Sequence, residues 1–139
     1  MNNYLEYQID KLIEKIDKMG FHAHKNNASR NFDGKYIQGE PYDYDMFLPG
    51  YCACFDAKMC QKSSYNIKDK DIKQINNLAK CKKAGMDSFF IIYFSSAKKL
   101  LKYDVDILVE ILESGKKSIN MDKGIKWDID NIIKKCIDK

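Results

Sequence analysis

Apolar side chains recur every three or four residues in four segments of the chain, a spacing that predicts amphipathic helices. The first helix is predicted over residues 3–19 and the second over residues 68–84. A third begins after Asp104 or Asp106, either of which can cap it, and a fourth spans residues 128–137. Each of these helices needs a surface on which to bury its apolar face.

Short runs between the helices have the lengths and apolar content of strands. The run at residues 88–95 is apolar almost throughout, which is typical of a central strand buried on both faces. The other predicted strands lie at residues 21–25, 41–45, 51–58 and 99–103. The expected fold class is α/β (α+β), with one mixed central β-sheet flanked by helices, in a single domain over residues 1–139.

Two polar connections separate these elements, at residues 26–40 and 59–67. The first has fifteen residues, which is long for a connection inside a compact domain. We therefore expect it to be either functional or mobile.

The composition fits an ordered protein with one core, and its mildly basic charge permits an anionic partner without requiring one. The chain has 139 residues, 45% of them hydrophobic, and a formal net charge of +4. The basic residues are almost all lysines, and Arg30 is the only arginine. Lysine contacts phosphate as a point charge, whereas reading of guanine in the major groove favours arginine. A nucleic-acid partner would therefore be recognised through its backbone and shape.

The same sequence argues against export, membrane insertion and structural zinc. The N-terminus lacks the apolar stretch of a signal peptide, and no apolar run has the length of a membrane span. The five cysteines are expected to be reduced thiols in a cytoplasmic protein. Cys52, Cys54 and Cys60 invite a zinc site, but a Cys-x-Cys pair on a strand lacks the two-residue turn of zinc knuckles.

Candidate chemistry is concentrated in the predicted hairpin around Pro49-Gly50. Side chains alternate along a strand, so Asp56 and Lys58 are expected to share one face. Hairpin closure would bring Asp43, thirteen residues upstream of Asp56, beside this pair. Two carboxylates can hold a hard divalent cation such as Mg²⁺, with the lysine against a bound water or a phosphate oxygen.

Other interpretations of the hairpin remain open. Asp45 shares a strand face with Asp43 and is an alternative first ligand. The main-chain carbonyl of Ala57 is a plausible additional ligand. Asp56 and Lys58 could also form no more than an ion pair at a strand end.

The order and spacing of several short segments resemble the RecU-type Holliday junction resolvases of Gram-positive bacteria and their phages, within the restriction-endonuclease-like nucleases. Asp43-Tyr44 followed by Asp56-Ala57-Lys58 resembles that family's Asp-Tyr and Glu-Ala-Lys at the same spacing. Further similar segments are Tyr4-Leu5-Glu6, Phe21-His22-Ala23-His24-Lys25, Lys62-Ser63-Ser64-Tyr65, Ile72-Lys73-Gln74 and Lys117-Ser118-Ile119.

This resemblance implies a restriction-endonuclease-like fold and a Mg²⁺-dependent endonuclease, with Mn²⁺ as a possible substitute. It implies a homodimer that nicks branched double-stranded DNA symmetrically, with no membrane and no small-molecule substrate. Asp43 and Asp56 would be metal ligands and Lys58 would orient water or stabilise charge on the phosphate. Glu6 would be an outer metal or water ligand and Gln74 a supporting residue. Candidate DNA contacts are Ser63, Lys25, Arg30, Lys62 and Lys73.

The sequence also departs from that family. The segment between His24 and Asp43 is shorter than the family's stalk, so residues 26–40 are expected to form a reduced stalk. Asp56 stands where the family mostly has glutamate, and no histidine precedes Gln74. Three other functions therefore remain open: a different restriction-like nuclease, a non-catalytic DNA-binding module, and a purely structural dimerisation protein.

Overall fold

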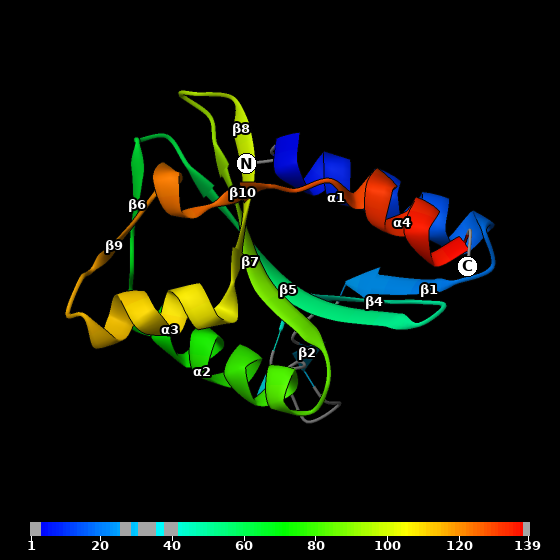
Figure 1. Cartoon of the computed structure of the whole chain (residues 1–139), viewed down its shortest axis with the longest axis horizontal. Helices are drawn as coiled ribbons and strands as arrows, with labels where there is room; N and C mark the ends of the chain where they lie inside the picture. The colour runs from blue at the N-terminus through cyan, green and yellow to red at the C-terminus, as the bar shows by residue number, and fades with distance from the viewer. Residues whose placement is uncertain (1–3, 26–28, 31–35, 38–41, 138–139) are drawn as a thin grey trace.

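A six-stranded mixed sheet lies at the centre of the computed structural model, which describes residues 4–25, 29–30, 36–37 and 42–137 (Figure 1). The strand order is β1-β4-β5-β7-β8-β10. Only β5 and β7 run parallel, and the other neighbours are antiparallel. The strands are β1 (His22–Lys25), β4 (Tyr44–Leu48), β5 (Tyr51–Cys60), β7 (Asp87–Phe94), β8 (Lys99–Asp104) and β10 (Ile125–Lys126).

Helices cover both faces of this sheet, which confirms the predicted fold class (Figure 1). The helices α1 (Tyr4–Lys18) and α4 (Ile129–Ile137) pack on one face, and α2 (Asp69–Lys83) and α3 (Val105–Glu113) on the other. The Asp104 side chain caps α3 by accepting a hydrogen bond from the Asp106 N–H. Among the residues that the structure describes, no helix is long and apolar enough to span a bilayer.

The hairpin of β4 and β5 positions the predicted carboxylates. Its two-residue loop is Pro49-Gly50, and Gly50 has a φ of 71°, which L side chains rarely adopt. The first strand runs from Tyr44 to Leu48, not over residues 41–45 as predicted, because the pairing extends to the turn. Tyr44 pairs with Phe55, so Asp43 stands just before the strand and opposite Asp56.

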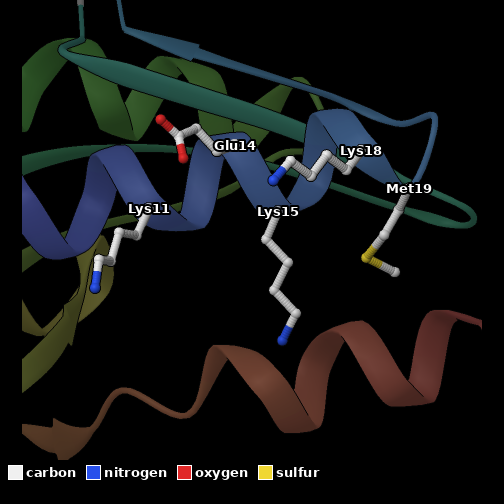
Figure 2. A pocket seen from close by; sticks show the side chains of 5 residues that line it. All are labelled: Lys11, Glu14, Lys15, Lys18 and Met19. Carbon is white, nitrogen blue, oxygen red and sulfur yellow. The ribbon is translucent and has the colours of Figure 1, made fainter.

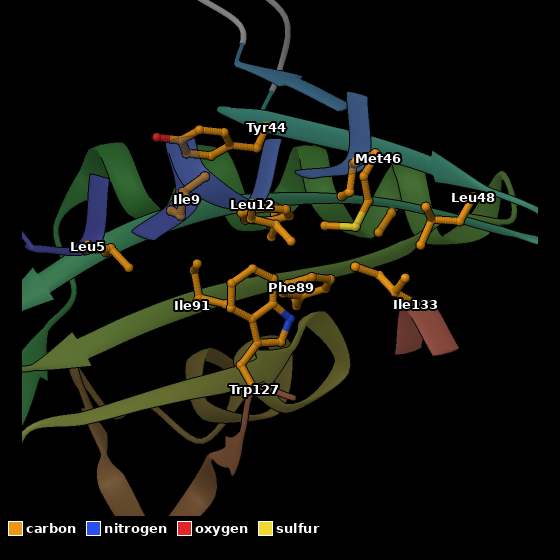
Figure 3. Close-up of a cluster of buried hydrophobic side chains, with 13 residues drawn as sticks. Leu5, Ile9, Leu12, Tyr44, Met46, Leu48, Phe89, Ile91, Trp127 and Ile133 are labelled. Carbon is orange, nitrogen blue, oxygen red and sulfur yellow. The ribbon is translucent and has the colours of Figure 1, made fainter. Parts of the chain in front are cut away.

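The two faces of β5 belong to different hydrophobic clusters, as the alternation of its side chains predicts. Phe55 lies in the cluster under α1 and α4, together with Tyr44, Phe89 and Trp127 (Figure 3). Cys54 lies in the cluster under α2 and α3. The strand β5 is therefore buried on both faces, which holds its backbone in place.

Two small sheets lie in segments for which the sequence predicted no strand. The strand β6 (Ser64–Asn66) pairs with β9 (Ser118–Asn120), and β5 extends to Cys60, so the prediction of a connection over residues 59–67 is wrong for most of its length. The strand β2 (Ser29–Arg30) pairs with β3 (Tyr36–Ile37) inside the predicted 26–40 loop. The remaining residues of that predicted stalk lie outside the described part of the chain.

A tight approach at Gly124, between the 3₁₀ helix η1 (Met121–Lys123) and β10, gives a first prediction. A Cβ atom at this position would lie 2.7 Å from Cζ of Tyr103 and 2.9 Å from Cβ of Leu101. The Tyr103 ring cannot move easily, because it is buried and its hydroxyl donates to the Asn120 carbonyl at 2.8 Å. Gly124→Ala should therefore lower the free energy of unfolding by about 1–3 kcal/mol.

Urea unfolding of the Gly124→Ala variant would measure this loss. Lys123→Ala is the matched control, because Lys123 is exposed and its truncation should change stability by less than about 0.5 kcal/mol. Equal midpoints for the two variants would show that the Tyr103 ring adjusts without cost.

Candidate active site

The hairpin brings Asp43, just before β4, beside Asp56, in the middle of β5. The main-chain N–H of Asp43 donates to Oδ1 of Asp56 at 2.9 Å. The Asp43 side chain is partly exposed, whereas the Asp56 side chain is completely buried. One carboxylate is therefore open to solvent while the other is fixed inside the protein.

The second oxygen of Asp56 is in an unfavourable position. Oδ2 is buried and has no hydrogen-bond partner within the described residues. Burial, with a further contribution from the Asp43 carboxylate and against the Lys58 ammonium, raises the pKa of Asp56 to about 7. An ionised carboxylate in such a place is costly unless a cation or a donor satisfies it.

Lys58 lies two residues beyond Asp56 and points to the same face of β5, towards α2. Its ammonium is 3.0 Å from Oδ1 of Asp71 and donates a hydrogen bond to Oε1 of Gln74. The ammonium also lies 5.3 Å from the centre of the Phe90 ring. The lysine is thus held by polar and aromatic groups on the α2 side of the sheet.

Asp45, the alternative first ligand, is engaged elsewhere. It pairs with Cys54 in the hairpin and not with Asp56. Its Oδ2 accepts a hydrogen bond from the Tyr42 hydroxyl at 3.1 Å, and its Oδ1 is 3.7 Å from Nε2 of His22. This geometry favours Asp43 over Asp45 as the partner of Asp56.

Glu6 lies on α1 and pairs with Lys25 on β1, with 2.9 Å between Oε1 and Nζ. The hydrogen bond from Lys25 lowers the pKa of Glu6 and raises the pKa of Lys25. Burial raises the pKa of Tyr44; Lys25 opposes this effect, and the carboxylates of Glu6 and Asp43 add to it. Glu6 and Asp43 therefore both lie within electrostatic range of the Tyr44 hydroxyl.

The other predicted residues differ in their exposure and in the element that carries them. Ala57 is partly buried between Asp56 and Lys58. Lys62 and Ser63 are exposed in the bend that follows β5, and Lys73 is exposed on α2. Arg30 lies in β2, where it pairs with Tyr36 through the backbone; its side chain lies outside the described part of the structure.

The structure adds Asp71 and Tyr65, which the sequence did not single out. The Tyr65 hydroxyl and the main-chain N–H of Lys68 both donate to Oδ2 of Asp71 at 2.9 Å. The sequence signal was weak, because Lys68 at the N-cap lacks the hydroxyl of a capping box, and only the acidic residue three positions later fits that pattern. That pattern predicts a structural role and gives no indication of the contact with Lys58.

The other metal-ligand chemistry considered from the sequence is not assembled in the described residues. No group of three or more histidine, cysteine, aspartate or glutamate side chains in the described ranges is arranged to hold a metal ion. Cys52, Cys54, Cys60 and Cys81 are free thiols. A cation at Asp43 and Asp56 would therefore complete its coordination with main-chain, water or phosphate oxygens.

A pocket on the other side of the sheet is distinct from this site. It is lined by Lys11, Glu14, Lys15, Lys18 and Met19 of α1 and the turn that follows it (Figure 2). At its edge Lys15 bridges to Asp130 of α4 at 2.9 Å. Its lining residues lie in the second half of α1 and the turn after it, on the sheet face opposite to Lys58, so this pocket is separate from the carboxylate pair.

Comparison of the chain with known protein families and structures identifies its relatives. The family model of Recombination protein U, RecU, matches residues 1–135. The chain belongs to the RecU family. Among curated protein sequences, none matches this RecU-family chain significantly.

A solved structure shares the fold of this RecU-family protein. It is Hjc, a Holliday junction resolvase from the archaeal hyperthermophile Archaeoglobus fulgidus. The two chains superpose with a TM-score of 0.52 at 15% sequence identity, over 84% of this chain and 94% of Hjc. The match shows that a RecU-family sequence and a distant resolvase share the restriction-endonuclease-like fold.

Proposed function

We propose that this protein is a metal-dependent endonuclease that resolves four-way DNA junctions by paired, symmetric nicks. Membership of the RecU family and the fold shared with Hjc together support a nuclease that acts on Holliday junctions. The proposal of metal-dependent cleavage rests on one observation: Asp43 pairs with a buried Asp56, which lies two residues before Lys58.

The residues present fit a divalent cation. The buried Oδ2 of Asp56 has no donor within the described residues, and the adjacent Asp43 carboxylate supplies a second hard oxygen. Asp43, Asp56 and the main-chain carbonyl of Ala57 would hold Mg²⁺, and Mn²⁺ would accept the same oxygens. When bound, such a cation lowers the pKa of a coordinated water and neutralises charge on phosphate oxygens.

Lys58 would place a positive charge beside the scissile phosphate. Asp71 and Gln74 engage the ammonium, which has three N–H donors, so one remains for a water or phosphate oxygen. A donor that is fixed before the reaction stabilises developing negative charge without a free-energy cost for reorienting the donor. Gln74 acts in this proposal by holding Lys58. Glu6 would act as an outer ligand once its pair with Lys25 opens.

The predicted set of basic and polar groups would bind the DNA backbone. Lys62 and Ser63 follow β5 directly, and Lys73 lies one position before Gln74 on α2. Lys25 and Arg30 complete the proposed set. Because most of these contacts are lysines, binding should weaken steeply with added salt.

Paired nicks require two active sites, so the active species is proposed to be a homodimer. A junction has two strands to cut at opposed positions, and each protomer would supply one set of Asp43, Asp56 and Lys58. Branched chromosomal or phage DNA as substrate would place the protein in the cytoplasm of a bacterium or of a phage-infected cell.

Cleavage of a synthetic four-way junction would test this function. Each of the four strands is labelled in turn, and a linear duplex with the sequence of one arm is the matched substrate. We expect Mg²⁺ or Mn²⁺ to produce symmetric cuts on two opposed strands of the junction and at most slow cleavage of the duplex. Ca²⁺ should permit binding without cleavage.

Either of two other outcomes would contradict this proposal and support a different function. Equal cleavage of junction and duplex would indicate a restriction-like nuclease without junction selectivity. Salt-sensitive binding without cleavage in any of these metals would indicate a DNA-binding module that has kept the fold.

A further inference from the structure

A buried carboxylate on α2 is in contact with the proposed catalytic lysine. Asp71 is 1% exposed and its Oδ1 lies 3.0 Å from the ammonium of Lys58, whose side chain is 11% exposed. Ion pairs in such places seldom stabilise a protein more than apolar residues of the same volume would, because both charges lose their hydration. The pair therefore calls for an explanation other than stability.

The two oxygens of Asp71 have different partners. Oδ2 accepts the Lys68 N–H at the start of α2 and the Tyr65 hydroxyl, each at 2.9 Å. Helix capping thus uses Oδ2 alone, and Oδ1 is left to Lys58. Tyr65 and the capping bond fix the direction of the carboxylate, so Oδ1 can hold the ammonium in one place.

Gln74 completes the arrangement from the same face of α2. It lies three residues after Asp71, which places both side chains on one side of the helix, and its Oε1 also accepts from Lys58. Burial on its own raises the pKa of Asp71, but the Lys68 N–H, the Lys58 ammonium and the Tyr65 hydroxyl outweigh it and lower that pKa. The carboxylate is therefore charged at neutral pH.

We propose that Asp71 is a positioning residue of the active site, which acts by holding the Lys58 ammonium beside Asp56. The inference rests on the proposed nuclease function. It assigns to Tyr65 a supporting part, because the Tyr65 hydroxyl orients Asp71 and does not itself contact Lys58. Asp71 would touch neither DNA nor metal, and its effect would be transmitted through Lys58 alone.

A double-mutant cycle between Asp71→Asn and Lys58→Ala would test this role. Asparagine keeps an oxygen for the Lys68 N–H, so the helix cap survives while the negative charge facing Lys58 is lost. We expect Asp71→Asn to lower the single-turnover rate of junction cleavage about 10-fold or more, and Lys58→Ala about 100-fold. In the Lys58→Ala background, Asp71→Asn should have no further effect.

A measurement of junction binding in Ca²⁺ distinguishes a positioning role of Asp71 from a general disruption of the structure. The Kd of Asp71→Asn should stay within about twofold of the wild-type value, because a buried side chain does not touch DNA. Asp69→Asn is the matched control: Asp69 is exposed in the first turn of the same helix, so its rate and Kd should both be unchanged.

The experiment distinguishes failure of the positioning role of Asp71 from failure of the proposed nuclease function. If the wild type does not cleave, the function itself is overturned, and this role with it. If the wild type cleaves but Asp71→Asn has no effect, or lowers the rate by the same factor with and without Lys58, only the positioning role is overturned. Should Asp71→Asn not fold, Tyr65→Phe takes its place in the cycle, with an expected loss of about threefold that disappears in Lys58→Ala.

Discussion

Replacing Asp56 with asparagine is expected to abolish cleavage while making the metal-free protein more stable. The variant removes one of two proposed metal-binding carboxylates, which should lower the cleavage rate at least about 10³-fold. It also removes a buried charge. The side-chain oxygen of the asparagine in Asp56→Asn could still accept the Asp43 N–H, so the main hydrogen bond at this position is kept.

The sign of the stability effect follows from the pKa. The pKa of Asp56 is raised to about 7 in the folded protein, from an ordinary value of 3.8. The folded state therefore holds this proton more tightly than the unfolded chain does, and stability falls as the pH rises from about 4 to about 7. The loss is on the order of 4 kcal/mol at most, since one unit corresponds to about 1.4 kcal/mol.

Urea unfolding in EDTA at pH 5 and pH 8 would measure this effect. Asp56→Asn should be more stable than the wild type at pH 8 by about 2 kcal/mol, with a smaller difference at pH 5. Added Mg²⁺ should stabilise the wild type and not the variant. A variant that is less stable than the wild type at pH 8 without metal would contradict the buried, unsatisfied state of Asp56.

Asp45→Asn is the matched control for the same site. Asp45 is a second buried carboxylate of this hairpin and is held by the Tyr42 hydroxyl. If cleavage depends on Asp45 and not on Asp43, the first ligand has been assigned to the wrong residue of the hairpin.

Truncation of Trp127 to alanine is expected to give the largest loss of stability. Its ring packs edge-on against Phe55, with 5.4 Å between ring centres. Its ring centre also lies 6.2 Å from that of Phe89, which Figure 3 labels beside it. Removing so large a buried side chain costs about 3–5 kcal/mol, a large share of the roughly 5–15 kcal/mol of a typical domain. The same cluster contains Tyr44 and Phe55, the neighbours in sequence of Asp43 and Asp56.

Trp127→Phe provides the comparison. The indole Nε1 is buried and has no hydrogen-bond partner within the described residues, so phenylalanine loses volume but no hydrogen bond. We expect a cost of about 1–2 kcal/mol for this variant in urea unfolding followed by circular dichroism. If the two variants lower the free energy of unfolding by the same amount, the indole contributes through something other than its packed volume.

Elements that depend on local pattern could be predicted from the sequence. The stripe of Leu5, Ile9, Leu12 and Ile16 defines the buried face of α1, and all four are buried. The alternation along β5 correctly placed Phe55 opposite Cys54 and Asp56. The Pro49-Gly50 turn fixed the register that sets Asp43 against Asp56. Each of these depends on neighbours within a short stretch of chain.

Elements that depend on distant pairing could not be predicted. The strands β6 and β9 have three residues each and join Tyr65 to Ile119, which no periodicity can indicate in so short a run. The contact of Asp71 with Lys58 depends on how α2, which lies in the connection from β5 to β7, packs against the sheet. The pair of Glu6 with Lys25 likewise depends on the docking of α1.

The outer strands of the sheet bear on how two copies could associate. The edge strand β1 has four residues and ends in Lys25, and β10 has two residues and ends in Lys126. Short edge strands that carry lysine resist the addition of a further strand, which protects a protein from edge-to-edge aggregation. If the protein forms the proposed homodimer, its interface is expected to consist of side-chain contacts and not of pairing between edge strands.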